Sequence, residues 1–417
     1  MSPHIATWIV SALSVGGVIV RPFAAPEALW AVAGAAILVV FGLVTPGLAL
    51  TGIAKGTDVY LFLTGMMLLA EVARREGLFD WLAALATSFS AGSPRRLFFL
   101  TYAVGIVVTV FLSNDATAVV LTPAVAAAAR AAGAQRPLPY LLICALVANA
   151  ASFVLPISNP ANLVIYGSRM PPLLGWLPQY ALPSALAIVA TYWLLRWTQR
   201  EALQQSIASH VPLPHLSGGG KVAAAGIAAT ALVLLIASAL DRQLGLPTCA
   251  AGALTAAVVL IRRPSHTWQV IGEIPWAVLP LVAGLFVLVE ALAQTGAIAA
   301  LGAALRDTAA HSTAAAAWGS GIAVAIAGNL ANNLPVALIA GGALAADHAA
   351  EPVIRAVLIG VDLGPNLSVT GSLATILWLT ALRREGIAIS ASAFLRIGAI
   401  VMPPALLLAI AAALLLG

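Results

Sequence analysis

The chain has 417 residues, of which 61% are apolar and only 8% are charged. A soluble domain carries about 25% charged residues, so this composition excludes an ordinary water-soluble protein. It predicts an all-α polytopic membrane protein embedded in a lipid bilayer. The net charge of +5 comes from basic residues that stand singly or in pairs between apolar runs, a pattern that argues against nucleic-acid binding.

Apolar runs long enough to cross a bilayer recur along the whole chain. A spanning helix needs about 20 mostly apolar residues. About ten spans are predicted, at 5–20, 27–47, 57–73, 138–166, 174–195, 221–240, 246–261, 275–293, 352–382 and 394–416. The polar stretch 201–220 is rich in Gly, Pro, Ser and His, and we interpret it as a cytoplasmic linker between two halves, 1–200 and 221–417.

The two halves carry matching residues in the same order. An offset of 219 relates Gly65 to Gly284, Glu71 to Glu290, Gly77 to Gly296 and Asn114 to Asn333. The pattern Asn-Leu-x-x-x-Gly also occurs twice, at 162–167 and 366–371. An internal duplication is the simplest explanation. Since the first half is predicted to cross the membrane an odd number of times, the second half would be an inverted repeat.

Two further apolar stretches, 97–130 and 312–348, have polar residues at their middle. The first contains Leu-Ser-Asn-Asp-Ala-Thr at 112–117, and the second contains Gly-Asn-Leu-Ala-Asn-Asn-Leu-Pro at 328–335. Arginines flank both ends of the first stretch, so we expect a re-entrant hairpin that enters from the cytoplasm and returns. The second stretch would form a hairpin from the opposite side. The alternative is four short conventional helices.

Two predicted spans are interrupted by Pro, Gly and polar residues. The interruptions are Pro156–Asn162 in the span 138–166, and Asp362–Ser372 in the span 352–382. Pro removes an amide donor and Gly relaxes the backbone, so each span is predicted to be a broken helix. Polar groups at membrane depth need protein or water around them, so we expect both breaks and both hairpin tips to meet at one site.

The candidate substrate-binding residues are the amides and hydroxyls of these four polar clusters. They are Asn114, Thr117, Ser158, Asn159, Asn162, Asn329, Asn332, Asn333, Asn366, Ser368 and Thr370. Hydrogen bonding between helices is the alternative role for any one of them. The clusters contain no lysine or arginine, which suits a small neutral hydroxylated solute better than a multivalent anion.

Asp115 and Asp362 are the acids of the polar clusters. A carboxylate in the membrane is costly unless it is paired, protonated or ion-bound. We therefore predict proton coupling through Asp115 first and Asp362 second. The alternative is that each caps the amides of the following half-helix. For Glu71, the plainest interpretation is an ion pair with Arg74 or Arg75 one turn away.

We expect no cofactor and no metal held by the protein. The two cysteines, Cys144 and Cys249, lie in apolar segments, and the six histidines lack metal-ligand spacing. An intramembrane enzyme is not favoured either, since the sequence has no HExxH motif and no paired catalytic aspartates with family motifs, and no histidine is expected to be buried. A discontinuous, duplicated site is more typical of alternating access than of a pure channel.

The interrupted stretch 362–378 resembles the signature of the arsenite efflux pump family, ArsB, within the ion transporter superfamily. Residues 113–123 resemble that family's first hairpin motif, and 158–162 its first break. The resemblance implies export of arsenite and antimonite, as the neutral trihydroxide, across the bacterial inner membrane in exchange for protons. It also implies elevator-type movement, commonly dimers, and sometimes a soluble ATPase subunit.

The hairpin tips depart from one group of relatives. The first tip, 113–117, resembles the Ser-Asn-Thr tips of sodium–dicarboxylate transporters with residues inserted, and the second, 332–335, lacks the threonine. A sodium- or proton-coupled carrier of carboxylates or inorganic anions therefore stays open as the alternative. Transporters of silicic acid are not distinguished by these residues.

Overall fold

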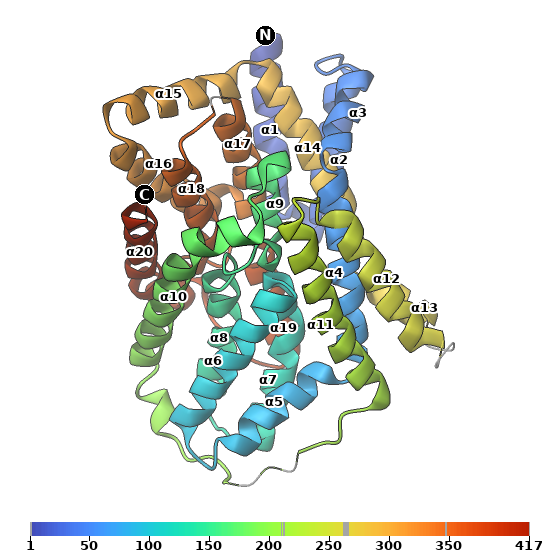
Figure 1. Ribbon diagram of the computed structural model, residues 1–417, viewed down its shortest axis with the longest axis vertical. Coiled ribbons are helices and arrows are strands. Elements are labelled where there is room, and N and C mark those ends of the chain that lie inside the picture. Colours follow the sequence, from blue (N-terminus) through green and yellow to red (C-terminus); the bar gives the residue numbers. More distant parts are fainter. Residues whose placement is uncertain (1, 210, 212, 262–266, 347, 417) are drawn as a thin grey trace.

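The computed structural model describes residues 2–416 except 210, 212, 262–266 and 347, and the described part is helical without strands (Figure 1). The first half contains α1 (Pro3–Val20), η1 (Pro22–Ala24), α2 (Glu27–Val40), α3 (Pro46–Lys55), α4 (Thr57–Arg75), α5 (Leu78–Phe89), α6 (Pro94–Phe111), η2 (Ala116–Leu121), α7 (Thr122–Ala131), α8 (Leu138–Ala150), η3 (Pro156–Ser158), α9 (Pro160–Tyr166), η4 (Gly167–Arg169) and α10 (Leu173–Thr198).

The second half follows the turn η5 (Ala202–Gln204). It contains α11 (Gly218–Ala239), α12 (Gly245–Ile261), α13 (Thr267–Glu273), α14 (Val278–Gln294), α15 (Ala297–His311), α16 (Thr313–Ala331), α17 (Asn333–Ala346), α18 (Glu351–Leu363), η7 (Gly364–Asn366), α19 (Leu373–Arg384) and α20 (Ala391–Leu415).

Seven described helices are long and apolar enough to cross a membrane. The pair α3–α4, bent by 48°, would make an eighth span. The protein is therefore a multi-pass membrane protein. The sequence predicted about ten spans plus two hairpins; the count by length is lower because α2 and α12 have only 14 and 17 residues and the interrupted spans are divided into short helices.

The predicted span 27–47 is wrong at its C-terminal end. Helix α2 stops at Val40, and Gly42 adopts φ +68°. Pro46 then begins α3, with the Thr45 side chain accepting a hydrogen bond from the amide of Leu48. A positive φ favours Gly, and Pro fits the first turn of a helix, so these residues separate two helices where hydropathy alone predicted one continuous span.

The same order of helices occurs in both halves. In the first half, α1 and α2 are followed by α3–α4, α5, α6–η2–α7, the interrupted helix α8–α9 and α10. In the second half, α11 and α12 are followed by α13–α14, α15, α16–α17, the interrupted helix α18–α19 and α20. The packing across the halves also recurs: α4 packs on α12, α14 packs on α2, and α10 packs on α20. The two halves are therefore interlocked and do not form two separate lobes.

Small residues allow the backbones of α4 and α12 to touch. A Cβ added at Gly65 would overlap the backbone of Thr248, and one added at Gly252 would overlap the carbonyl of Gly65. Small residues at helix crossings let membrane helices pack closely, since lipid supplies no hydrophobic drive for association. The crossing of α4 and α12 thus depends on these two glycines.

Gly65→Ala is expected to destabilise the protein by about 1–3 kcal/mol, because the added methyl group meets backbone and cannot be accommodated by a rotamer change. The measurement is thermal unfolding of the purified protein in detergent. Gly16→Ala in α1 is the matched control, because a Cβ there meets open space. Equal unfolding temperatures for the two variants would contradict this account of the crossing.

Both predicted hairpin stretches form two helices joined by a short tip. In 97–130, α6 ends at Phe111 and the chain re-enters helix through the π-helical η2. In 312–348, α16 ends at Ala331, Asn332 adopts φ +65°, and α17 begins at Asn333. Each stretch is preceded by a helix, α5 or α15, that links it to the preceding span.

The second interrupted helix breaks at the predicted residues, whereas the first break begins earlier than the predicted 156–162, directly after Ala150. Helix α8 ends at Ala150 and the chain resumes helix at Pro160, while α18 ends at Leu363 and helix resumes at Leu373. The helix that follows each break packs against helices of the other half: α9 packs on α17 and α18, and α19 packs on α7 and α8. The breaks and the hairpin tips of both halves are therefore brought together.

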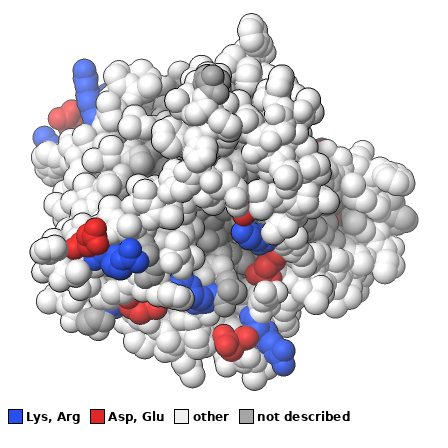
Figure 2. Space-filling view, turned by 90° about the horizontal axis from the view of Figure 1, so that it is seen from above, with Lys and Arg blue, Asp and Glu red and all other residues white. Residues whose placement is uncertain are grey.

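Charged side chains are sparse on the surface. Figure 2 shows the end of the molecule that carries α15 and the N-terminus, where acidic and basic side chains lie close together on a mostly uncharged surface. Large apolar side chains elsewhere are exposed, among them Leu13 at 69% and Trp268 at 82%. Such a surface suits contact with lipid.

Candidate functional site

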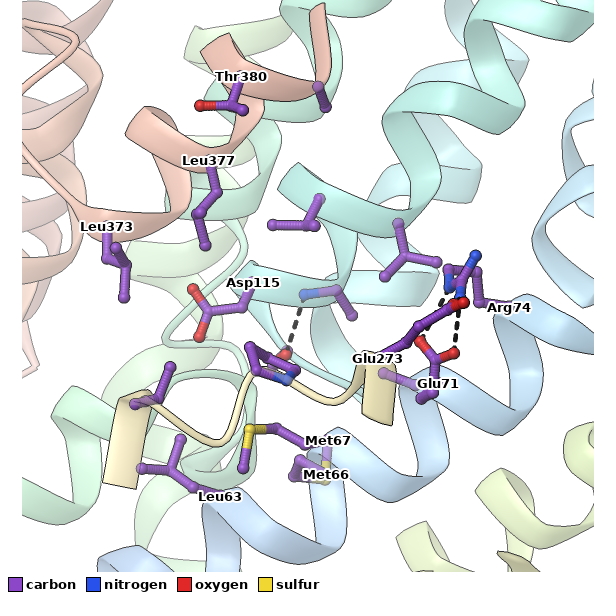
Figure 3. Close-up of a pocket in the computed structure, with 18 of the residues that line it drawn as sticks. Leu63, Met66, Met67, Glu71, Arg74, Asp115, Glu273, Leu373, Leu377 and Thr380 are labelled. Carbon is purple, nitrogen blue, oxygen red and sulfur yellow. Dashed lines mark hydrogen bonds and ion pairs between the residues drawn. The ribbon is translucent and has the colours of Figure 1, made fainter. Parts of the chain in front are cut away.

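A cavity of about 440 Å³ lies between α4 on one side and the first hairpin and α19 on the other. Its α4 wall includes Leu63, Met66, Met67 and Ala70, which lie on one face of the helix. Leu377 of α19 lies opposite (Figure 3). Most of the lining is apolar, so the few polar groups that reach the cavity determine its chemistry.

Asp115 is the acid that the first hairpin tip presents to this cavity. Its carboxylate points into the space between α19 and α4 (Figure 3). The tip is held locally: the backbone amide of Asp115 donates to Asn114 Oδ1 at 2.9 Å, and that of Ala116 donates to Ser113 Oγ at 3.1 Å. Among the described residues nothing donates a hydrogen bond to the Asp115 carboxylate, which leaves it available to the cavity.

A cluster of ion pairs forms one end of the cavity. Glu71 pairs with Arg74 at 2.6 Å and with Arg75 at 3.1 Å, which confirms the interpretation drawn from the sequence. Glu273, which precedes α14, also pairs with both arginines. Arg384 of α19 lines the same cavity and is exposed.

The cavity is not free of cations, in contrast to the polar clusters considered from the sequence. Two arginines line it, Arg74 and Arg384, together with four carboxylates. The carboxylates are those of Glu71, Asp115, Glu273 and Glu385. Three of these carboxylates are ion-paired among the described residues, Glu71 and Glu273 with Arg74 and Arg75 and Glu385 with Arg130, so Asp115 is the lining acid whose charge has no such partner there.

Asp362 lies elsewhere, in a hydrogen-bonded network between the two breaks. It is fully buried, and its carboxylate accepts hydrogen bonds from Ser152 Oγ and Asn159 Nδ2, both at 2.7 Å. Asn159 Oδ1 in turn accepts from the amide of Ala161 at 3.0 Å and caps α9. The Asp362 carboxylate therefore ties α18 to the first break.

The amides at the breaks also satisfy carbonyl groups that the interruptions expose. Asn366 Nδ2 donates to the carbonyl of Leu146 at 3.0 Å, and Asn149 Nδ2 donates to Asn366 Oδ1 at 2.9 Å. Asn162 Nδ2 donates to the carbonyl of Ser152 at 2.9 Å, and Ser158 Oγ to that of Val110 at 3.1 Å. Backbone groups at membrane depth need such partners.

The second hairpin tip is joined to the second break in the same manner. Asn329 Nδ2 donates to the carbonyl of Gly364 at 2.8 Å, and Ser368 Oγ donates to Asn329 Oδ1 at 2.7 Å. Thr370 Oγ1 donates to the Asn329 carbonyl at 3.0 Å. The backbone amide of Asn333 donates to the carbonyl of Gly371 at 3.0 Å. This tip and break therefore form one hydrogen-bonded unit.

The predicted site residues thus separate into those at the cavity and those in the networks. Asp115 lines the cavity; Asn114 and Thr117 are buried behind it, with Thr117 Oγ1 2.8 Å from Thr109 Oγ1. The remaining candidates lie at the breaks and the second tip, outside the cavity lining: Ser158, Asn159, Asn162, Asn329, Asn332, Asn333, Asp362, Asn366, Ser368 and Thr370.

Asn149 and Ser152 take part in the site region but were not among the candidates. Asn149 lies in the last turn of α8 and Ser152 directly after it, where the apolar run leads into the first break. Ser113 and Pro160, which line the cavity, were also missed as individual residues. These residues could have been identified as polar side chains within about one helical turn of a break, because the break leaves backbone groups there without helical partners.

The two cysteines do not line this cavity: Cys144 is fully buried in α8, and Cys249 lies in α12. Within the described part of the chain, no group of three or more His, Cys, Asp or Glu residues is placed to hold a metal ion.

Comparisons with known proteins cover nearly the whole chain. Residues 8–360 match the sequence profile of the CitMHS family, described as citrate transporter. The arsenical pump membrane protein of Escherichia coli K12 is 28% identical over 412 residues, 91% of each chain. That of Yersinia enterocolitica is 28% identical over 377 residues, 83% of each chain. An uncharacterized transporter of Mycobacterium bovis is 27% identical over 381 residues, 84% of each chain.

A solved structure has the same fold. The crystal structure of the YdaH transporter of Alcanivorax borkumensis aligns with a TM-score of 0.57 and 15% sequence identity, covering 99% of this chain and 97% of that one. The similarity to the arsenical pumps confirms the resemblance drawn from 362–378, and these relatives are transporters rather than enzymes. This multi-pass membrane protein with bacterial transporter relatives belongs to the citrate transporter family, CitMHS.

Proposed function

We propose that the protein is a secondary active transporter that exports arsenite and antimonite, as neutral trihydroxides, across the bacterial inner membrane in exchange for protons. The names of its relatives support the substrate. The observation that carries the proposal is the Asp115 carboxylate, which faces the cavity, accepts no hydrogen bond from the described residues and has no ion pair among them.

Asp115 can exchange a proton with water in the cavity because its carboxylate is only partly buried and is not engaged by a neighbour. An ionised carboxylate is costly in a membrane, so a change in its surroundings during transport would favour uptake or release of the proton. Asp362 is the second candidate. Its two hydrogen-bonded partners make it the less accessible of the two acids.

The amides and hydroxyls of the tips and breaks would bind the trihydroxide, since each substrate OH donates one hydrogen bond and accepts others. Asn114 and Thr117, directly behind the cavity tip, are the nearest of the candidates to Asp115 in the chain. The groups at the breaks bond to one another in this conformation. Substrate binding by them would therefore replace bonds within the protein.

The proposed movement is of the elevator type, with two inverted repeats. Helices α4, α12, α14 and α2 would form the scaffold, because they pack on one another across the halves. The hairpins and interrupted helices would move together, because hydrogen bonds join them. The cavity lies between these two sets of elements. A homodimer and a soluble ATPase subunit enter the proposal through the resemblance alone.

A carboxylate carrier is the second candidate, and it is favoured by membership of the citrate transporter family, CitMHS. A tricarboxylate would meet the unpaired carboxylate of Asp115 in the cavity, and Arg74 is already paired with Glu71 and Glu273. Unfavourable charge of this kind raises the cost of binding an anion. We therefore rank the neutral substrate first.

The test is arsenite accumulation in everted membrane vesicles with an acid interior and no sodium. Export coupled to proton entry predicts accumulation that a protonophore collapses, with vesicles lacking the protein as the control. Vesicles that contain folded protein and accumulate citrate with sodium, but no arsenite, would replace the leading proposal by the carboxylate carrier.

A further inference from the structure

The cavity beside Asp115 is far larger and more apolar than a solute of one arsenic atom and three hydroxyl groups requires. Its volume of about 440 Å³ lies in the range of pockets that hold drug-sized organic ligands, about 300–1,000 Å³. The side chains of Leu63, Met66 and Leu377 line it and offer no hydrogen bonds to hydroxyl groups. The lining instead provides a surface for an apolar ligand body.

The charges along the cavity are unevenly distributed. Glu71 and Glu273 are paired with Arg74 and Arg75, and Glu385 is paired with Arg130 at 2.7 Å. Asp115 is the one acid of the cavity lining that has no ion pair within the described part of the chain. A single unpaired carboxylate in a mainly apolar wall attracts a cation that can bring its own apolar groups.

Arg384 does not cancel this attraction. It lies seven residues beyond Leu377 on α19, which corresponds to about 10 Å along the helix, and its side chain is exposed. Solvent screens a charge in that position. Figure 3 shows Asp115 close to Leu377 and on the opposite side of the cavity from the Glu71–Arg74 pair.

We propose that this cavity is a binding site for small amphipathic organic cations. The cationic group would lie against the Asp115 carboxylate, and the apolar body would lie between α4 and α19. Met66 and Met67 favour an aromatic body, because thioethers are polarizable and make favourable contacts with aromatic rings. Binding does not depend on the proposed transport of arsenite, whereas inhibition of that transport by the bound cation rests on it.

The probe is phenyltrimethylammonium, titrated into the purified full-length protein in detergent by isothermal calorimetry. Benzenesulfonate, an anion of similar size, serves as the charge-reversed ligand. The cation is expected to bind saturably and the anion not to bind. Asp115→Asn is expected to weaken the affinity for the cation by about tenfold, because the ion pair between the quaternary ammonium group and the carboxylate is lost.

Two further variants keep the interpretation specific. Asp307→Asn removes an exposed carboxylate of α15 that does not line the cavity, and it is expected to bind the cation as the wild type does. Leu377→Trp fills part of the cavity while keeping the carboxylate of Asp115, and it is expected to reduce binding by a similar factor. Variants are compared after their thermal unfolding shows that they are folded.

The cation site would be overturned if the folded wild type showed no saturable binding. It would also be overturned if the wild type and folded Asp115→Asn bound the cation with equal affinity. Binding to Leu377→Trp at wild-type affinity would also overturn it, because the body of the ligand would then lie elsewhere. Arsenite uptake by vesicles that contain the wild-type protein tests the transport proposal separately. If the wild type binds the cation but its vesicles accumulate no arsenite, the transport proposal alone is rejected.

Discussion

Asp115→Asn is expected to abolish arsenite uptake driven by a pH gradient, down to the level of vesicles that lack the protein. Asparagine has the size of aspartate but cannot bind and release a proton in the physiological range. The side chain projects into the cavity and accepts no hydrogen bond from the described residues, so folding should not require its charge. The measurement is uptake into everted vesicles with an acid interior, at equal amounts of folded protein.

Asp115→Glu and Asp307→Asn separate the role of this carboxylate from a general effect of charge. Glutamate keeps a titratable group at the tip and is expected to retain part of the uptake. Asp307→Asn, on exposed α15, is expected to transport as the wild type does. Wild-type uptake by Asp115→Asn, still sensitive to a protonophore, would remove Asp115 as the carrier of the proton.

Asp362→Ala is expected to lower the free energy of unfolding by about 1–3 kcal/mol, the cost of one unsatisfied buried polar group. The alanine leaves Asn159 Nδ2 without its buried acceptor, whereas Ser152 Oγ can still donate to the carbonyl of Asn149 at 2.8 Å. Loss of the tie between α18 and the first break should also loosen the cap of α9. Thermal unfolding of the purified protein in detergent measures the effect.

Asp362→Asn is the matched control, because it keeps one acceptor oxygen and the volume of the side chain. It is expected to unfold between the wild type and Asp362→Ala. An alanine variant that unfolds at the wild-type temperature would contradict the structural role. If folded Asp362→Asn loses uptake driven by the pH gradient while Asp115→Asn keeps it, Asp362 would be the residue that carries the proton.

The sequence by itself determined the class of this protein and the places where its helices are interrupted. A bilayer penalises every unpaired polar group, so breaks were predicted at Pro156–Asn162 and Asp362–Ser372. Helix α18 ends at Leu363, inside the second interval, while α8 ends at Ala150, a few residues before the first. The ion pairs of Glu71 with Arg74 and Arg75 could also be predicted from the sequence, because residues three and four apart share a helix face. The order of helices that recurs in both halves follows from the same pattern of spans and polar interruptions.

Only the tertiary structure decided the difference between the two acids. Asp115 and Asp362 looked alike as carboxylates beside polar interruptions, but one projects into a cavity and the other is bound by Ser152, 210 residues away. Asn149 and Asn366, 217 residues apart, meet for the same reason. Such contacts depend on which helices pack together, and local hydropathy and spacing carry no information about that packing. The arginines that line the cavity likewise come from α4 and α19, which only the packing of the two halves brings opposite one another.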